Sequence, residues 1–418
     1  MNTRLMTVDR DTKAWFRASW LTRHLAIQYP DHYRIVCFDK LDYCASLNNI
    51  KCLEGRKNFE FCYGDITNGA DVLRALKRYK IDTIFHFAAQ SHVDLSFGNS
   101  FQFTKTNVEG THVMLECAVK SHIRRFIHIS TDEVMGEVGF GDPDLLENSV
   151  LAPTNPYSAS KAAAEMYVNA YAKSFKLPVI IVRSNNVYGP HQFPESQSSF
   201  PSIICPDHSP DTEIIPKFSC LLTVGSALML HGDGRNTRRY LYAGNAADAF
   251  DTILHKGKIG EIYNVDSSDE ISNRDLAYKL LEIFQVPEEQ RRSQIVFTQD
   301  RPFNDKRYAV DGTKLRKLGW EQQTTFAEGL RTTVDWYQQF GRAWWGDVES
   351  VLTPFPVVRE GEIYPDADSR KHPVTPVQET AITFSEQQKP EVDGHQEVSE
   401  SNGHLTSPTN GHLTPVTA

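Results

Sequence analysis

Short runs of apolar residues alternate with longer amphipathic stretches along the first half of the chain. Near-continuous apolar runs are typical of parallel strands that helices cover on both faces. Five such runs predict strands at Arg34–Phe38, Phe59–Tyr63, Thr83–Phe87, Arg125–Ile129 and Pro178–Arg183. Apolar residues at helical spacing predict helices at Ser19–Tyr29, Asp71–Tyr79, Val108–Ser121 and Tyr157–Lys176. This alternation predicts an α/β fold with a doubly wound parallel sheet, which binds ligands at the carboxyl ends of its strands.

The second half of the chain changes to loops and shorter helices. We expect residues 1–190 to form a Rossmann-like domain and 191–346 a smaller substrate-binding lobe, with 240–265 returning to the first domain. Three prolines and little regular pattern predict a surface insertion at 197–213. Residues 347–418 are rich in Pro, Thr, Ser, Glu and Gln, which predicts a disordered tail, either simply solvated or used for docking.

Composition narrows the class of protein. The chain has 418 residues, 40% of them apolar, and a formal net charge of −9, which argues against nucleic acid or an anionic membrane as the main partner. Its seven cysteines include no CxxC pair, so they indicate reduced thiols rather than a zinc site or disulfides. No apolar run approaches the roughly 20 residues that span a bilayer, and Met1–Arg17 lacks the apolar core of a secretory signal. We therefore expect a cytoplasmic location.

Tyr157 and Lys161 stand four residues apart at the start of a predicted helix. This spacing puts both side chains on one helical face. A nearby ammonium favours a phenolate, so we expect Lys161 to lower the pKa of Tyr157 and allow it to take a proton from a sugar hydroxyl. The alternative is a chance spacing on a surface helix.

Polar residues follow the strand at Arg125–Ile129. Thr131, Asp132 and Glu133 come at its carboxyl end, where this architecture places active sites. Two adjacent carboxyls can divide into acid and base when their surroundings push their pKa values apart. The alternative is a polar loop that caps a helix.

Two further strand ends suit a dinucleotide. Ala88 and Ala89 are small enough for a flat ligand to approach closely, although tight packing explains them equally well. Asp39 ends the strand RIVCFD, where an acidic residue holds a ribose 2′-hydroxyl and repels a 2′-phosphate. This favours NAD over NADP as cofactor, and a solvated loop aspartate is the alternative.

Together these segments resemble the dTDP-glucose 4,6-dehydratases, which are extended short-chain dehydrogenases. The resemblance covers about residues 19–345 and rests on Thr131-Asp132-Glu133 above all, because related epimerases usually lack the acidic pair. The matching segments, in order, are FDKLDYCASLNN, GDIT, FHFAAQSHVDLSF, TNVEGT, STDEV, PTNPYSASKAAAE, VRSNNVYGP, IIPKF, GDGRNTRRYLY, IYNV and RPFNDKRYAVD.

The resemblance implies a role for each catalytic residue. The residue matching Tyr157 takes the C4 hydroxyl proton while hydride passes from C4 to NAD⁺, and the one matching Thr131 hydrogen-bonds the developing C4 carbonyl. The residue matching Glu133 removes the C5 proton, and the one matching Asp132 protonates the departing C6 hydroxyl. Hydride then returns to C6, which gives a 4-keto-6-deoxy sugar. Lys161 is expected to orient the nicotinamide ribose and tune the tyrosine.

The resemblance also implies binding residues and an assembly. The cofactor contacts are expected at Asp39, Asp65, Ile66, Ala88, Ala89, Asn107, Tyr157 and Lys161. The nucleotide-sugar contacts are expected at Asn186, Arg238, Asn264 and Tyr308, with Arg238 facing the diphosphate. The helices near Val108 and Tyr157 are expected to pair two copies into a homodimer.

One part of the chain departs from the family pattern. The family opens with a strand and a Gly-Gly-x-Gly-Phe-Ile loop, which lets the backbone approach a pyrophosphate. Here Thr12, Lys13 and Trp15 stand where glycine belongs, and Met1–Arg10 lacks the apolar run of a central strand. We therefore expect the sheet to lose its middle strand and bulky side chains to fill the phosphate site.

Two explanations of this departure compete. The first is an altered N-terminus from a wrong start or splice choice, which the insertion at 197–213 also fits. The second is a true variant that binds NAD poorly, such as a pseudoenzyme that binds a sugar nucleotide or a partner. An epimerase or decarboxylase acting on a UDP-sugar is a further alternative, and Asp132-Glu133 argues against it. Met135 and Asn304 replace the usual Tyr and His, which affects the nicotinamide pocket and the hold on the sugar nucleotide.

Overall fold

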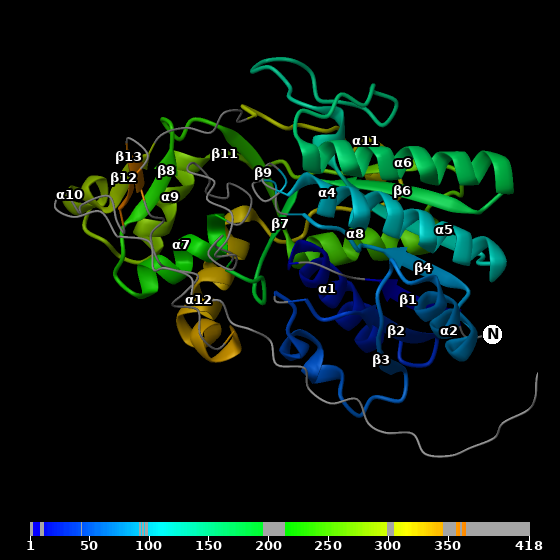
Figure 1. Ribbon diagram of the computed structural model, residues 1–418. Helices are drawn as coiled ribbons and strands as arrows, with labels where there is room; N and C mark the ends of the chain where they lie inside the picture. The colour runs from blue at the N-terminus through cyan, green and yellow to red at the C-terminus, as the bar shows by residue number, and fades with distance from the viewer. Residues whose placement is uncertain are drawn as a thin grey trace, which may run out of the picture.

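Seven parallel strands form the sheet of the larger domain (Figure 1). The computed structural model describes residues 3–8, 12–42, 44–91, 93, 96, 99–194, 214–298, 305–345, 357–359 and 362–364. The sheet order is β10-β6-β5-β4-β1-β2-β3, and every neighbouring pair is parallel. The strands are β1 Thr3–Val8, β2 Tyr33–Asp39, β3 Phe59–Tyr63, β4 Thr83–His86, β5 Arg125–Thr131, β6 Val179–Ser184 and β10 Ile262–Val265. The predicted doubly wound parallel sheet is confirmed.

The expectation that the middle strand is missing was wrong. β1 pairs with β2 on one side and with β4 on the other. Leu5, Met6 and Val8 are fully buried, which supplies enough apolar surface for a central position. Thr7 is also fully buried, and its hydroxyl lies 2.9 Å from that of Thr22, so the polar residue in the strand is satisfied.

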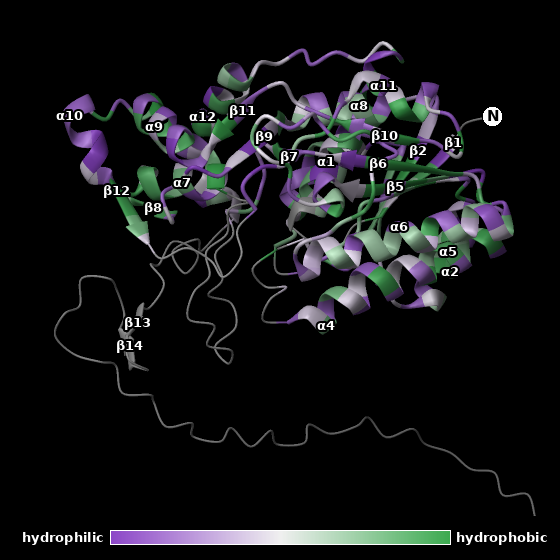
Figure 2. Ribbon diagram, turned by 90° about the horizontal axis from the view of Figure 1, so that it is seen from above, coloured by the Kyte–Doolittle hydropathy of each residue, from purple (hydrophilic) through white to green (hydrophobic). Residues whose placement is uncertain are grey.

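Helices cover both faces of the sheet, and Figure 2 shows the apolar strands between them. One apolar cluster joins the sheet to α1 and α8, and a second joins it to α2, α5 and α6. The bounds are α1 Thr12–Gln28, α2 Gly69–Tyr79, α5 Thr111–Lys120, α6 Pro156–Phe175 and α8 Ala243–Lys256. The shorter elements are η1 Leu47–Leu53, α4 Ser100–Phe103, the π-helical turn η2 Thr104–Gly110 and η3 Asp132–Met135.

A smaller lobe lies beside the carboxyl ends of β5 and β6. It holds two small sheets, β11-β9-β7 and β12-β8, over a third apolar cluster (Figure 1). Its strands are β7 Asn186–Tyr188, β8 Leu228–His231, β9 Thr237–Tyr242, β11 Glu270–Ser272 and β12 Ile295–Thr298. Its helices are α7 Ile214–Thr223, α9 Asn273–Ile283, α10 Glu288–Arg291, η4 Arg292–Gln294 and α12 Phe326–Trp345, whereas α11 Thr313–Arg316 lies against β10.

Some predictions for the second half of the chain concern residues that the structure does not describe. The insertion predicted at 197–213 and the substitution at Asn304 lie outside the described residues. In the tail predicted to be disordered, the structure describes only the antiparallel strands β13 Val357–Arg359 and β14 Glu362–Tyr364. These six residues are not disordered as predicted, because the two strands pair with each other. None of the helices in the described ranges is long and apolar enough to cross a membrane.

Candidate active site

Helix α6 begins with a cap that fixes the position of Tyr157. The Asn155 side chain accepts a hydrogen bond from the Ser158 amide at 2.8 Å, and the Ser158 hydroxyl accepts one from the Asn155 amide at 3.2 Å. Pro156 occupies the first helical turn, where its missing N–H is not needed. Tyr157 and Lys161 are therefore one turn apart on the same helix, and both are buried.

Lys161 is held against the end of β5. Its Nζ donates a hydrogen bond to the Ile129 carbonyl at 2.8 Å, and the side chain is 3% exposed. Burial, together with the charge of Arg17, lowers the pKa of Lys161 to about 7, and the charge of Glu165 opposes this shift. The ammonium can therefore lose its proton near neutral pH.

The expectation for Tyr157 was wrong in direction. Burial raises its pKa above the ordinary value, and the charge of Glu133 adds to the shift. Arg17 and a hydrogen bond with Thr131 lower it in part. The reason is geometric: Lys161 points to a backbone carbonyl, and a carboxylate rather than the ammonium is the main charge near the phenol.

Thr131 ends β5, Asp132 and Glu133 begin η3, and all three residues are buried. Thr131 caps the short helix η3, and its hydroxyl accepts a hydrogen bond from the Glu133 amide at 3.4 Å. Asp132 and Glu133 are 4% and 3% exposed, so neither carboxyl lies in bulk solvent. Gly136 ends this turn at φ +80°, and a Cβ there would collide with the Ala152 carbonyl oxygen. Only glycine fits this turn.

Asp132 has a partner that the sequence did not reveal. Asn185 donates a hydrogen bond from Nδ2 to the Asp132 carboxyl at 2.7 Å, and its own carbonyl accepts one from the Ser267 amide at 2.9 Å. Burial raises the pKa of Asp132, whereas Asn185, Thr131, Arg17 and Arg238 lower it in part. The two asparagines of VRSNNVYGP look alike in the sequence, and only the strand geometry shows which one faces Asp132.

The smaller lobe contributes Arg238 and Tyr308. The Arg238 guanidinium lies 4.9 Å from the centre of the Tyr308 ring and donates a hydrogen bond to the Asp305 carbonyl at 2.9 Å. The Tyr308 hydroxyl hydrogen-bonds the Asp305 carboxyl. Burial raises the pKa of Tyr308, and the charge of Glu133 adds to it, so Glu133 lies close to Tyr308 as well as to Tyr157. Asp305 is a second residue that sequence reasoning missed.

A buried ion pair holds α6 to the sheet under the site. Arg183 on β6 donates to both carboxylate oxygens of Glu165, at 3.0 and 2.8 Å, and these side chains are 3% and 0% exposed. The Arg183 Nη1 also lies 3.2 Å from the sulfur of Met135. The methionine that replaces the family's tyrosine is thus a buried packing residue over this pair.

The predicted cofactor residues lie along the carboxyl ends of β2, β3 and β4. Asp39 ends β2, is fully buried, and accepts a hydrogen bond from the Leu41 amide. Asp65 follows β3 and accepts two hydrogen bonds from Thr67 at 2.9 Å, from the amide and the hydroxyl. Ile66 beside it is buried against the helices of the second cluster.

The end of β4 is joined to α6 by Asn107. Its amide group donates to the Gln90 carbonyl and to the Ser160 hydroxyl, both at 2.8 Å. Ala88 and Ala89 are 1% and 3% exposed, so other atoms of the protein cover both residues, and a ligand contact there stays a prediction. Asn107 lies in a π-helical turn, a distortion frequent at functional sites.

The two remaining asparagines differ in their surroundings. Asn186 begins β7, and its Nδ2 is buried without a hydrogen-bond partner among the described residues. Asn264 on β10 donates to the Leu145 and Asp311 carbonyls at 3.1 and 3.2 Å. These contacts give the Asn264 amide a structural task and do not bring it to the catalytic group, so its role toward a sugar nucleotide stays a prediction.

Helix α1 occupies the position of the glycine loop. Trp15 is 1% exposed, and its Nε1 donates to the Ser46 carbonyl at 3.1 Å. The indole packs with Cys37 and Ile50 in an apolar cluster, and whether it fills the space of a phosphate stays a prediction. Phe16 joins the apolar cluster under the sheet, and Arg17 reaches the end of β6.

Part of the site has polar atoms that a dinucleotide could bind. The end near Tyr157 and Lys161 offers buried polar atoms that lack a partner among the described residues, namely the Asn186 amide and the Ser130 hydroxyl. Such atoms call for a polar ligand, since leaving them unpaired costs free energy. The residues present therefore fit the nicotinamide end of a dinucleotide, and the diphosphate contact is the part that has changed.

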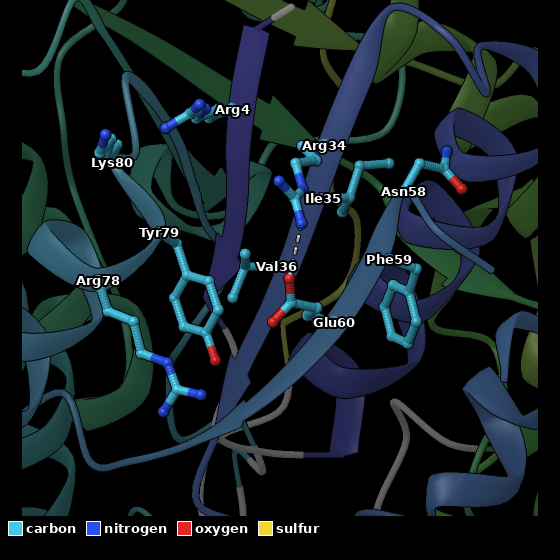
Figure 3. Close-up of a pocket in the computed structure, with 10 residues that line it drawn as sticks. All are labelled: Arg4, Arg34, Ile35, Val36, Asn58, Phe59, Glu60, Arg78, Tyr79 and Lys80. Atoms are coloured by element: carbon cyan, nitrogen blue, oxygen red, sulfur yellow. Dashed lines mark hydrogen bonds and ion pairs between the residues drawn. The ribbon is translucent and has the colours of Figure 1, made fainter. Parts of the chain in front are cut away.

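The pocket in Figure 3 lies at the opposite end of the sheet. It has a volume of about 320 Å³ and is lined by residues at the amino ends of β1, β2 and β3 and at the end of α2. Arg34 and Glu60 form an exposed ion pair there at 3.2 Å, drawn as a dashed line. None of the predicted site residues lines this pocket, and ligands of open α/β sheets bind at the other edge. We therefore assign the active site to the carboxyl ends of the strands.

The fold and this site are those of the extended short-chain dehydrogenases. The profile of the GDP-mannose 4,6 dehydratase family matches residues 16–333. The chain belongs to this family. The match begins one residue after Trp15, so it includes the catalytic group and omits most of the altered loop.

Relatives of known activity include two kinds of dehydratase. A trifunctional UDP-glucose 4,6-dehydratase/3,5-epimerase/4-keto-L-rhamnose reductase of Arabidopsis thaliana is 49% identical over 82% of this chain and 48% of its own. The dTDP-D-glucose 4,6-dehydratase of Homo sapiens is 42% identical over 82% of this chain and 93% of its own. This chain thus spans about half the length of the plant relatives.

Solved structures agree with this assignment. The dTDP-glucose 4,6-dehydratase of Streptomyces venezuelae, solved with NAD bound, superposes with a TM-score of 0.73 at 35% identity, over 82% of this chain and 99% of its own. A Thermus thermophilus UDP-glucose 4-epimerase with NAD gives 0.69 at 25% identity, over 80% of this chain and 99% of its own.

Proposed function

We propose that this chain catalyses the NAD-dependent 4,6-dehydration of a nucleotide-activated glucose, which yields a 4-keto-6-deoxy sugar. The observation that carries the proposal is the buried group formed by Thr131, Asp132, Glu133 and Tyr157 at the carboxyl end of β5. The removal of water across C5 and C6 needs an acid and a base. The carboxyls of Asp132 and Glu133 can supply both.

The side chains divide the reaction between them. In its ionised form Tyr157 takes the proton of the C4 hydroxyl, although burial and Glu133 disfavour that form. Thr131, which already hydrogen-bonds this side chain, donates to the C4 oxygen as it becomes a carbonyl. Bound NAD supplies a hydride acceptor and, once reduced, a hydride donor. Lys161 and Asp39 are the groups that would hold its two riboses, and Asn107 keeps the intervening edge in place.

The two carboxyls are suited to opposite tasks. Burial raises the pKa of Asp132, so this carboxyl keeps its proton and can give it to the departing C6 hydroxyl. Glu133 lies close to both Tyr157 and Tyr308 and acts as the base that removes the C5 proton. The C6 hydroxyl leaves as water with the proton of Asp132, and Glu133 returns the C5 proton to C5 when C6 is reduced. The proton taken by Tyr157 replaces the one that Asp132 gave, so the net change is the loss of one water.

The relatives support a choice between the two nucleotides. The plant enzymes named for UDP-glucose are 48 to 49% identical to this chain, and the human enzyme named for dTDP-glucose is 42% identical. We therefore propose UDP-glucose as the preferred substrate and dTDP-glucose as the alternative.

A direct assay tests the activity. The purified full chain is incubated with NAD and either UDP-glucose or dTDP-glucose, and the 4-keto product is detected by mass spectrometry. Loss of one water per sugar supports the proposal. An epimerised sugar of unchanged mass would instead support the epimerase alternative, and loss of carbon dioxide from UDP-glucuronate would support a decarboxylase.

A second candidate function is a catalytically impaired binding protein. The buried Trp15, which stands where glycine belongs, favours it, because the indole occupies space that the family gives to the diphosphate loop. Binding of UDP-glucose with no product at any NAD concentration would support this candidate.

We also propose a homodimer through α4, α5 and α6. These helices lie side by side on one face of the sheet (Figure 1), and their outer surface carries large exposed apolar residues. Phe101, Met166 and Phe175 are 87%, 61% and 55% exposed, which is typical of a surface that binds a partner. Met166→Glu should give a monomer by light scattering, whereas Ile259→Glu, at another exposed apolar site, should leave the mass unchanged.

The proposed location is the cytosol. None of the six described cysteines forms a disulfide, and four of them are buried. Reduced buried thiols suit a reducing compartment. Cell fractionation that finds the chain with a secreted or organellar marker would contradict this.

A further inference from the structure

Arg17 carries a cationic group from α1 into the active site. It lies in the second turn of α1, and its guanidinium donates to the Ser184 hydroxyl at 3.2 Å and to the Asn185 carbonyl at 3.5 Å. Ser184 ends β6, and Asn185 holds Asp132. The guanidinium therefore lies at the carboxyl edge of the sheet, beside the catalytic group.

Arg17 forms no ion pair within contact distance in the described part of the chain, although the Asp132 carboxyl lies near enough for the two charges to interact. Both of its hydrogen-bond acceptors are neutral oxygens, and its Nε is buried without a partner in the described part of the chain. A half-buried guanidinium with spare donors is costly unless an anion completes it. The arrangement thus has donors available for an incoming ligand.

The charge of Arg17 acts on three residues of the catalytic group. Burial dominates the pKa shifts of Asp132, Tyr157 and Lys161, and the charge of Arg17 lowers the pKa of all three. Arg238 of the smaller lobe acts on Asp132 in the same direction. Two guanidinium groups, one from each lobe, thus lie near the same buried carboxyl.

We propose that Arg17 is a diphosphate-binding residue, which offers a side-chain guanidinium at the active site of a chain that lacks the family's glycine loop. This inference rests on the proposed function, because both the dinucleotide and the sugar nucleotide carry a diphosphate. The planar guanidinium fork matches phosphate oxygens with paired, charge-assisted hydrogen bonds. Arg17 comes from the larger domain and Arg238 from the smaller lobe.

Binding measurements separate the two sources of the diphosphate. Calorimetric titrations of the full-length protein with NAD and with UDP compare wild type, Arg17→Gln, Arg17→Lys and a control, Arg34→Gln, which removes a charge from the far edge of the sheet. We expect Arg17→Gln to weaken one of the two ligands about tenfold or more. Arg17→Lys should recover part of the loss, because it keeps the charge without the fork. Arg34→Gln should bind both ligands as wild type does.

The outcomes distinguish this inference from the proposed function. Weaker NAD with unchanged UDP assigns Arg17 to the dinucleotide, and the reverse assigns it to the sugar nucleotide. Affinities within about twofold of wild type for both ligands, or tighter NAD binding in Arg17→Gln, would overturn the inference. If wild type still makes the 4-keto product in that case, the proposed function stands. If Arg17→Gln weakens binding but no sugar is dehydrated, the inference stands and the function fails.

Discussion

The two ends of the parallel sheet carry charged residues in opposite surroundings. At the carboxyl end, Asp132 and Lys161 are almost fully buried and their pKa values are shifted. At the amino end, the pocket of Figure 3 is lined by Arg34, Arg78 and Lys80, which are exposed to solvent. The comparison shows that many charges in a cavity do not by themselves indicate a reactive site. Water screens exposed charges, whereas burial shifts the pKa values of the groups it covers.

The largest effect is expected from Tyr157→Phe. Removal of the hydroxyl takes away the group proposed to accept the C4 proton, so kcat should fall about 10²- to 10⁴-fold. Tyr171→Phe is a matched control on the same helix, since that hydroxyl contacts His112 and Glu116 instead. Turnover assays with UDP-glucose measure both. A Tyr157→Phe enzyme with more than about a tenth of wild-type kcat would rule out this role.

Next in size is Glu165→Leu, which tests the buried support of the carboxyl end. The variant leaves Arg183 as an uncompensated buried charge, because Glu165 accepts both of its hydrogen bonds. The free energy of unfolding should fall by about 3–5 kcal/mol. Urea denaturation followed by circular dichroism measures it. A loss below about 1 kcal/mol would mean that the ion pair contributes no more than a surface pair.

The pH dependence of stability tests the burial of Lys161. Its folded pKa is about 7 and its ordinary value is 10.5, so the unfolded state binds the extra proton between these limits. The free energy of unfolding should therefore rise with pH in this window, by up to about 1.4 kcal/mol per unit, and this contribution is lost as pH falls through 7. Lys161→Met should lack that rise. Equal slopes for the two proteins between pH 7 and 9 would contradict the assignment.

A smaller effect is expected from Asn185→Ala. Asn185 is a positioning residue, and its hydrogen bond to Asp132 favours the ionised carboxyl, so its loss should raise the pKa of Asp132 further. We expect kcat to fall about tenfold and the alkaline limb of its pH profile to move to higher pH. A lower kcat with an unmoved limb would indicate only a packing role.

The smallest effect is expected at the amino end of the sheet. Arg34→Gln breaks an exposed ion pair with Glu60. The Arg34 side chain is 57% exposed and the Glu60 side chain is 42% exposed. Stability should change by less than about 0.5 kcal/mol, and kcat should not change. A measurable loss of turnover in this variant would break the contrast between the two ends.

The sequence predicted the layers of the larger domain well. The continuous apolar run at Pro178–Arg183 lies within one residue of β6 at both ends, because a strand covered on two faces leaves few alternatives. β1 was missed, since only Leu5, Met6 and Val8 are apolar and the buried Thr7 depends on a distant hydroxyl. Such long-range satisfaction of a polar group is not visible in a local pattern.

The candidate site could be predicted as a set of residues but not as a geometry. The structure brings Thr131, Glu133 and Tyr157 together, while their roles stay a prediction. Arg17 and Asn185 could not be found, because the direction of a side chain at the end of a strand or in the second turn of a helix depends on packing.

The links between the two lobes determine how they can move. A single residue, Asn185, joins β6 to β7, no residue separates β9 from α8, and β10 leads back into β11 through four residues. These three connections are short, so a change in the angle between the lobes would act on them directly. Because Asn185 is itself one of them and holds Asp132, such a change would reach the proposed acid through one hydrogen bond.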